Sequence, residues 1–251
     1  MQGIFFIAKK KIFWYNEKTL YNLNNQNKNM AKLFLLRHLK SQWNKENRFA
    51  GWTDGPLCKE GLKKAKDLTR KIFKHKIDVI YSSPLFRNQD TVARILEYNR
   101  KYPLFIHLDG GKMQKWGHFT DLSKYDIPVY ISENLNERYY GKLQGLNKAK
   151  IIKKYGVQKV RLWRRSFNVA PPGGKSLKDT FERAIPFFKK YIEKDLKQGK
   201  NVLIVASHNS LRAIVKYIEK ISDEDIINLE IPYAGLIKYE FGKNLRLKKR
   251  N

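Results

Sequence analysis

The side chains of this sequence that could do chemistry together are a histidine, several arginines and one glutamate. His38 directly follows Arg37 in the stretch LLRHLKSQWN, residues 35–44. A neutral imidazole can attack phosphorus and form a phosphohistidine, which splits one difficult transfer into two easier steps. Guanidinium groups suit the charged oxygens of a phosphoryl group in transfer. These residue types indicate phosphoryl transfer, with His38 as the nucleophile and Arg37 beside it.

The remaining parts of such a site occur further along the chain. Three more arginines are candidates to bind charged oxygens, namely Arg87, Arg164 and Arg165. Glu137, in LNERYYG, is the candidate acid–base group for a substrate hydroxyl. Asn44 and Asn209 are candidate neutral hydrogen-bond donors. Each residue also has an ordinary explanation, such as a turn, a solvated helix face or a local ion pair, and only their joint occurrence favours catalysis.

Other chemistries find little support in the sequence. It contains no Walker loop, no GxGxxG after an apolar strand and no HExxH. The spacing of His107 and His118 matches no metal-ligand pattern, and we interpret them as two solvent-facing histidines. Cys58 is the only cysteine, so an intrachain disulfide and a multi-thiolate metal site are excluded. We therefore expect no metal, and we expect a reducing compartment such as the cytoplasm.

The positive charge of the chain is its most unusual bulk property. The 251 residues include 52 Lys and Arg against 23 Asp and Glu, a net charge of +29 at pH 7. This excess favours anionic partners, from nucleic acid to small phosphorylated metabolites, although dispersed charge also fits compositional drift. No apolar stretch reaches the ~20 residues that span a bilayer. We expect a small phosphorylated metabolite as the partner, not nucleic acid or a membrane, and a monomer or a homodimer.

Apolar runs alternate with amphipathic stretches along most of the chain. We expect strand followed by helix three times, over residues 32–38 and 59–73, 77–87 and 87–98, and within 201–221. This order predicts a three-layer α/β/α fold with a mostly parallel open sheet, and residues 235–242 add an antiparallel edge strand. Ligands of such sheets bind beyond the carboxyl ends of the strands. Because His38, Arg87 and His208 each follow a strand, we expect them to meet at one rim.

Two regions fall outside this pattern. Residues 1–30, rich in Asn and Lys, are interpreted as an N-terminal extension outside the fold, with organelle targeting as an alternative to a cytoplasmic location. Residues 31–251 then form one domain. The stretch 99–134 holds aromatics, glycines and prolines without clear periodicity. We interpret it, at about 99–132, as an insertion or a long loop over the sheet edge.

Five segments resemble successive motifs of the 2,3-bisphosphoglycerate-dependent phosphoglycerate mutases, a branch of the histidine phosphatase superfamily. They are LLRHLKSQWNKENRFAGWTDGPL (35–57), SSPLFRNQDTVARIL (82–96), LNERYYGKLQGLNKA (135–149), WRRSFNVAPPGGKSLKDT (163–180) and VLIVASHNSLRAIVK (202–216). The resemblance runs from about residue 32 to the C-terminus, broken by the insertion. The short APPGGKSL link resembles the compact members of the family.

The resemblance implies an enzyme that interconverts 3- and 2-phosphoglycerate, in glycolysis and gluconeogenesis, through a phosphohistidine. The implied primer is 2,3-bisphosphoglycerate, with no metal. His38 would be the nucleophile, Glu137 the proton donor and acceptor, and a second histidine near Asn209 would stabilise the transition state. The implied substrate-binding residues are Arg37, Asn44, Ala50, Gly51, Arg87, Tyr140, Lys148, Arg164, Arg165 and Asn209.

Four substitutions inside the motifs separate this chain from the family pattern. Leu39 replaces a glycine and could narrow the phosphate seat, while Lys40 replaces a glutamate and would depress the imidazole pKa. Tyr139 replaces a histidine beside the acid. The turn reads ASHN in place of AHGN, so Ser207 stands where the family has its second histidine and His208 where it has glycine. We favour a re-aimed His208 over Ser207 acting in its place.

These substitutions leave three hypotheses open. The first is the mutase. The second is a histidine-type phosphatase of the same superfamily, in which water intercepts the phosphohistidine. The third is a degenerate, low-activity member that acts as a binding protein.

Overall fold

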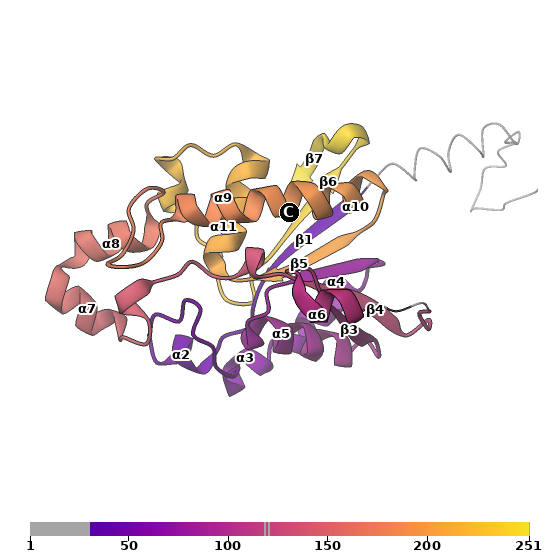
Figure 1. Ribbon diagram of the computed structural model, residues 1–251, viewed down its shortest axis with the longest axis horizontal. Coiled ribbons are helices and arrows are strands. Elements are labelled where there is room, and N and C mark those ends of the chain that lie inside the picture. Colours follow the sequence, from indigo (N-terminus) through magenta and orange to yellow (C-terminus); the bar gives the residue numbers. More distant parts are fainter. Residues whose placement is uncertain (1–30, 118, 120, 251) are drawn as a thin grey trace, which may run out of the picture.

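A seven-stranded sheet forms the centre of the computed structural model, which describes residues 31–117, 119 and 121–250 (Figure 1). The strand order is β3-β4-β2-β5-β1-β6-β7. The strands are β1 Ala31–Arg37, β2 Val79–Ser82, β3 Tyr102–His107, β4 Asp126–Ile131, β5 Val202–Ala206, β6 Leu236–Phe241 and β7 Leu247–Arg250. Strands β1 to β5 pair in parallel, whereas β6 and β7 are antiparallel. The predicted mostly parallel α/β sheet is confirmed.

Helices cover both faces of this sheet, as the three-layer prediction requires (Figure 1). The first half of the chain contributes α2 Gln42–Lys45, α3 Lys59–Leu62, α4 Ala65–Ile72, α5 Phe86–Glu97 and α6 Gly111–Trp116. The second half contributes α7 Lys148–Tyr155, α8 Val157–Arg165, α9 Leu177–Phe187, α10 Glu193–Lys197 and α11 His208–Glu219. A π-helical turn, Phe188–Ile192, joins α9 to α10. No helix within the described residues is long and apolar enough to cross a bilayer.

Successive residues of β1 pack into two different cores. Leu33 and Leu35 belong to the cluster shared with α9, α10 and α11, whereas Phe34 and Leu36 belong to the cluster shared with α4 and α5. This alternation follows from the period of two in a β-strand. Because β1 is buried on both faces, its sequence is a continuous apolar run. The strand is therefore a rigid support for Arg37 and for the residue that follows it.

The loop predicted for residues 99–134 is wrong. This stretch supplies α6 and two parallel strands, β3 and β4, and β4 pairs with β2 through Ile80 and Val129. Two features hid the strands: β3 is an edge strand whose residues stay partly exposed, and each strand contains a proline, Pro103 or Pro128. Whether the stretch is an insertion relative to the family remains a prediction.

Two smaller expectations also meet the structure here. Strand β6 covers the predicted stretch 235–242 and is antiparallel, but it is not the edge, because β7 pairs with its outer side. His107 ends β3 and is half-buried, not solvent-facing, while His118 lies outside the described residues. The N-terminal extension and any targeting role of residues 1–30 also lie outside the described residues.

Helices α7 and α8 form a separate pair that extends beyond the sheet, at the left of Figure 1. They have a small apolar core of their own, made by Phe49, Leu143, Ile151, Val160 and Trp163. Gly156 ends α7 and begins α8 with a φ of 84°, a left-handed conformation that glycine adopts most readily. Basic residues of the pair line the same cavity as Arg37, at the end of β1, and His208, just after β5.

Candidate active site

His38 is held at the carboxyl end of β1 with a defined tautomer. Its Nδ1 lies 2.6 Å from the carbonyl oxygen of Leu39, and the residue is only 3% exposed. Since a carbonyl oxygen can only accept, Nδ1 carries the proton and Nε2 keeps its lone pair. Burial, followed by the charges of Arg87 and Arg37, holds the pKa of His38 well below its ordinary value. The imidazole is therefore neutral at pH 7, as a nucleophile must be.

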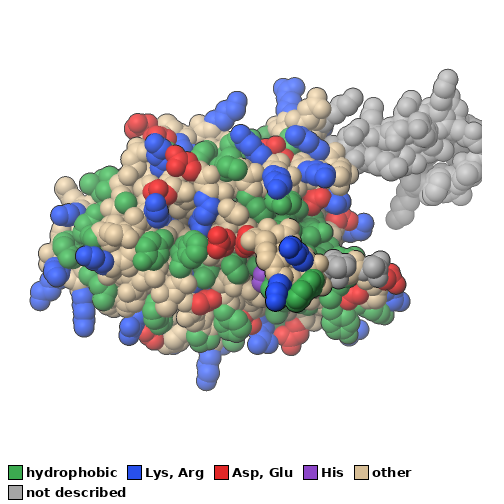
Figure 2. Space-filling model, in the orientation of Figure 1, with side chains coloured by type: hydrophobic (Ala, Val, Ile, Leu, Met, Phe, Trp, Pro, Cys, Tyr) green, Lys and Arg blue, Asp and Glu red, His purple; other side chains and the backbone are tan. Residues whose placement is uncertain are grey.

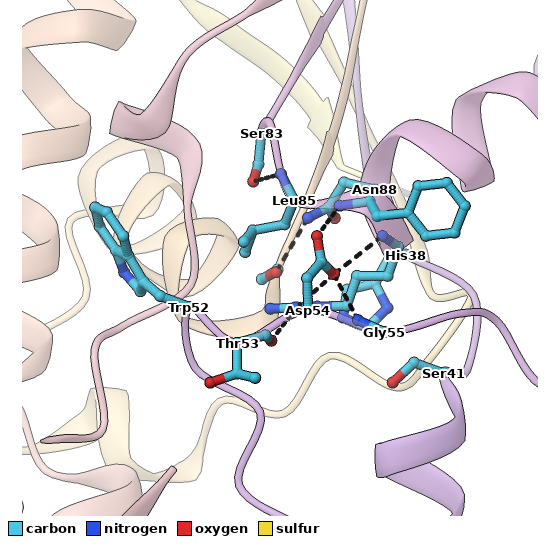
Figure 3. Close-up of polar contacts among 12 residues, drawn as sticks. His38, Ser41, Trp52, Thr53, Asp54, Gly55, Ser83, Leu85 and Asn88 are labelled. Atoms are coloured by element: carbon cyan, nitrogen blue, oxygen red, sulfur yellow. Dashed lines mark hydrogen bonds and ion pairs between the residues drawn. The ribbon is translucent and has the colours of Figure 1, made fainter. Parts of the chain in front are cut away.

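Arg87 is fixed by the loop that follows α2. Its guanidinium donates to the carbonyl oxygens of Gly51 (2.7 Å) and Thr53 (3.1 Å) and to Asp54 Oδ1 (3.2 Å). The Asp54 carboxylate, labelled in Figure 3, also accepts from the backbone N–H of Phe86, at the start of α5. An aspartate there suits the exposed N–H groups and the dipole of the helix. Asp54 therefore couples the helix start to the position of the guanidinium.

Glu137 is a buried carboxyl group that lines the same cavity as His38 and Arg87. It is 7% exposed, and its Oε1 accepts from the backbone N–H of Arg138 and from Asn209 Nδ2, both at 2.7 Å. Its carbonyl oxygen accepts from the Trp52 indole at 2.6 Å. Arg183, on α9, donates to the carbonyl oxygens of residues 133 and 136 beside it. Trp52 and Arg183 leave no signal in the sequence, since their contacts are with backbone carbonyl oxygens.

A cavity of about 410 Å³ joins these groups to the basic residues of α7 and α8. Twelve predicted site residues line it: Arg37, His38, Asn44, Ala50, Gly51, Arg87, Glu137, Tyr140, Lys148, Arg164, Arg165 and His208. Ser207 and Asn209 do not line the cavity. Asn209 donates a hydrogen bond from Nδ2 to Oε1 of Glu137. The lining also includes residues that the sequence analysis did not assign as binding groups: Lys40, Asn47, Arg48, Phe49, Glu230 and Tyr233.

The cavity has two sides of different construction. We call Arg37, His38 and Arg87 the sheet side, because Arg37 ends β1, His38 directly follows it and Arg87 lies shortly after β2. We call Lys148, Arg164 and Arg165 the helix side, because they belong to α7 and α8. Burial, followed by the charges of Arg164 and Arg37, lowers the pKa of Lys148 to about 8. Seven Lys and Arg side chains face two carboxylates here, so the cavity suits a small, multiply charged anion.

Comparison with known proteins places the chain in a family. The model of the histidine phosphatase superfamily (branch 1) matches residues 33–116 and 117–250. The 2,3-bisphosphoglycerate-dependent phosphoglycerate mutase of Methanococcus vannielii is 47% identical over 212 residues, which is 84% of this chain and 90% of that protein. The Protochlamydia amoebophila enzyme of the same name is 38% identical, over 88% of this chain and 100% of its own. The chain belongs to the phosphoglycerate mutase family of this superfamily.

Solved structures of low sequence identity share the fold of this phosphoglycerate mutase family member. Mycobacterial hydrolase 1 superposes with a TM-score of 0.68 at 21% identity, over 87% of this chain and 96% of that one. Bacillus stearothermophilus YhfR gives a TM-score of 0.67 at 20% identity, over 87% and 94%. The resemblance read from the sequence motifs, and the fold it implies, are thus confirmed.

The leucine that replaces the family glycine does not enter the cavity. Leu39 is fully buried in the core shared with α4 and α5, and its backbone N–H donates to Thr91 Oγ1 at 3.0 Å. Its φ is not positive, so the position does not need glycine. Lys40 does line the cavity, but the charges that lower the pKa of His38 are those of Arg87 and Arg37.

The second histidine of the phosphoglycerate mutase pattern is displaced along the chain, yet an imidazole still lines the cavity. Strand β5 ends at Ala206, so Ser207 and His208 belong to the turn and the first residue of α11. Ser207 is fully buried, and its hydroxyl accepts from Asn88 Nδ2 at 3.4 Å. His208 faces the cavity, with Nε2 3.4 Å from the backbone nitrogen of Ile231. Strand β5 stays paired with β1 up to Ala206, and His208 lines the cavity from the first residue of α11.

Burial determines the protonation state of His208 as well. Its pKa is held well below the ordinary value by burial first, and then by the charges of Arg37 and Arg212. At pH 7 it is therefore a neutral group among arginines. A transition-state role for His208, or for Ser207 in its place, remains a prediction.

Proposed function

We propose that this protein interconverts 3-phosphoglycerate and 2-phosphoglycerate through a phosphohistidine at His38, as a step of glycolysis and gluconeogenesis. One observation carries the proposal: a neutral imidazole, its Nδ1 proton engaged by the Leu39 carbonyl, faces a cavity with two guanidinium groups beside it. The names of the relatives at 38 to 47% identity support the same reaction.

Each half of the reaction is a direct displacement at phosphorus. In the first half, the primed phosphohistidine is attacked by the free hydroxyl oxygen of 3-phosphoglycerate, Glu137 takes the proton of that hydroxyl, and the bond from phosphorus to Nε2 breaks to give 2,3-bisphosphoglycerate and free His38. In the second half, Nε2 of His38 attacks the phosphorus of the other phosphate, the bond from that phosphorus to the glycerate oxygen breaks, and Glu137 gives that oxygen its proton, which releases 2-phosphoglycerate and restores the phosphohistidine. Because Oε1 of Glu137 already accepts two hydrogen bonds, we assign the proton to Oε2. Arg37 and Arg87 balance the charge on the transferring oxygens.

The helix side binds the part of the substrate that does not react. Lys148, Arg164 and Arg165 provide three cations for the carboxylate and the distal phosphate of the glycerate, with Tyr140 beside them. The same two-sided charge distribution fits 2,3-bisphosphoglycerate, which carries two phosphates on one small skeleton. When bound, this primer supplies the phosphoryl group that charges His38. Ala50 and Gly51 line the wall through backbone, and Asn44 adds a neutral donor.

The experiment that tests the proposal gives purified protein 3-phosphoglycerate, with and without 2,3-bisphosphoglycerate, and assays both products. We expect 2-phosphoglycerate that depends on the primer. Free phosphate without 2-phosphoglycerate would indicate the phosphatase, and neither product would indicate a binding protein. His38→Gln should be inactive, and His107→Gln, a histidine outside the cavity, should keep the activity of the natural chain.

The partners and location proposed from the sequence stand beside this function. Lys and Arg side chains are scattered over the face shown in Figure 2 and do not gather in a stripe, which supports a metabolite and not nucleic acid as the partner. Cys58 is buried and unpaired, which supports a reducing compartment such as the cytoplasm. A monomer or a homodimer remains our prediction, and sedimentation equilibrium measures it.

A further inference from the structure

A second carboxylate stands at the mouth of the cavity and has no part in the reaction described above. Glu230 Oε2 pairs with Arg165, while Oε1 lies 3.6 Å from Arg37 Nη1 and 3.4 Å from His208 Nε2. The Glu230 side chain is 49% exposed, whereas those of Arg37, Arg165 and His208 are 10%, 23% and 10% exposed. The carboxylate therefore covers two guanidinium donors, Arg37 and Arg165, that lie deeper than itself.

Arg37 does not depend on Glu230 for its position. Its Nη1 donates to the Ile231 carbonyl oxygen at 2.6 Å, and its guanidinium lies 3.8 Å above the Tyr233 ring. The Arg37 contact with Glu230 is longer, at 3.6 Å. The backbone and the tyrosine thus hold the guanidinium, and the carboxylate mainly changes the charge that an entering anion meets.

The consequence of this placement is electrostatic. A fixed negative charge at a cavity mouth opposes every anion that enters, and the opposing energy grows with the charge of the anion. It also competes for the guanidinium donors of Arg37 and Arg165, which a phosphate or a carboxylate would otherwise use. The negative charge of Glu230 therefore weakens the binding of a bisphosphate more than it weakens the binding of a monophosphate.

We propose that Glu230 is a specificity-determining residue, which weakens the binding of doubly phosphorylated glycerate relative to the monophosphate. The inference rests on the proposed function, because it takes these glycerates as the ligands. In this role Glu230 lowers the affinity for anions, whereas a residue that positions Arg165 would raise it. A carboxylate that only orders Arg165 would strengthen anion binding, and its removal would weaken it.

The test measures dissociation constants by calorimetry in a His38→Gln background, where no phosphoryl transfer to residue 38 disturbs the titration. The ligands are 3-phosphoglycerate and 2,3-bisphosphoglycerate at fixed ionic strength. Glu230→Gln keeps the shape of the side chain and removes its charge. We expect about tenfold tighter binding of the bisphosphate and about threefold tighter binding of the monophosphate. Unchanged or weaker binding of the bisphosphate, or an equal gain for both ligands, overturns the inference.

Two further variants exclude trivial explanations. Glu230→Asp keeps the charge and should stay within about twofold of the parent for both ligands. Glu224→Gln removes an exposed carboxylate outside the cavity and should also leave both constants within about twofold. An equal gain in Glu224→Gln would assign the effect to net charge and overturn the inference. A parent that binds neither glycerate would instead overturn the proposed function, and with it this inference.

Discussion

The sheet side and the helix side of the cavity carry similar charges but are built in different ways. On the sheet side, His38 and Arg87 are 3% and 2% exposed, and backbone carbonyl oxygens fix both. On the helix side, Arg165 has 23% of its side chain exposed and pairs with a carboxylate that is itself half exposed. Rigid groups suit bond-making, where small displacements are costly, and adjustable ion pairs suit the binding of a substrate that must reorient.

The largest expected effect tests whether Glu137 acts in catalysis together with the sheet side. Glu137→Gln keeps the volume and the acceptor oxygen but cannot carry the proton. We expect kcat to fall by about 10²- to 10⁴-fold with little change in KM. Steady-state assays of 2-phosphoglycerate formation measure this. Glu133→Gln, an exposed carboxylate four residues earlier, should leave kcat intact, and a similar loss there would contradict the role of Glu137.

The second prediction contrasts one arginine from each side. Arg87→Gln removes charge from the transferring oxygens, so kcat should fall by about 10²- to 10³-fold. Arg164→Gln removes a binding group, so KM should rise by about tenfold while kcat changes little. Because Arg87 is buried, Arg87→Lys and a thermal melt check that the loss is not unfolding. A kcat defect in Arg164→Gln as large as that in Arg87→Gln would break the distinction between the two sides.

The smallest effect is a difference in pH dependence. The pKa of Lys148 is lowered to about 8, so the helix side loses a positive charge as pH rises through that value, and KM should increase by about tenfold. Lys148→Arg should remove this alkaline rise, because arginine stays charged. Because the pKa of His38 is well below its ordinary value, the imidazole is neutral at pH 7 and stays neutral in mildly acidic solution. Protonation of His38 should therefore limit kcat only well below pH 6.5. A KM independent of pH between 7 and 9 would contradict the first part.

The sheet side could be predicted because its residues follow elements with a strong local pattern. The apolar run before Arg37 and His38 indicates a strand buried on both faces, and the motif around Arg87 sits at the next strand–helix junction. By contrast, β3 lies at the edge and keeps Tyr102 63% exposed, so its pattern resembles a loop. The exposed strand β7, whose residues include three consecutive basic side chains, gave no signal of burial at all.

The part of the site that escaped prediction depends on contacts between distant segments. Glu230 lies 193 positions from Arg37 in the chain, and no local pattern links the two. Substrate binding by Asn209 stays a prediction, while the hydrogen bond that its amide donates to Glu137 had no signal in the sequence. Trp52 and Arg183 contact backbone carbonyl oxygens, which any sequence provides at every position. Tertiary hydrogen bonds of this kind leave no periodicity to read.

The most direct test of the account is to find the phosphorylated atom. The protein is incubated with ³²P-labelled 2,3-bisphosphoglycerate, quenched in alkali and mapped by peptide analysis, and ³¹P NMR identifies the ring nitrogen. We predict acid-labile phosphate on Nε2 of His38, because Nδ1 is engaged by the Leu39 carbonyl, and no label in His38→Gln. Label confined to His208, or an unlabelled protein that still forms 2-phosphoglycerate, would contradict it.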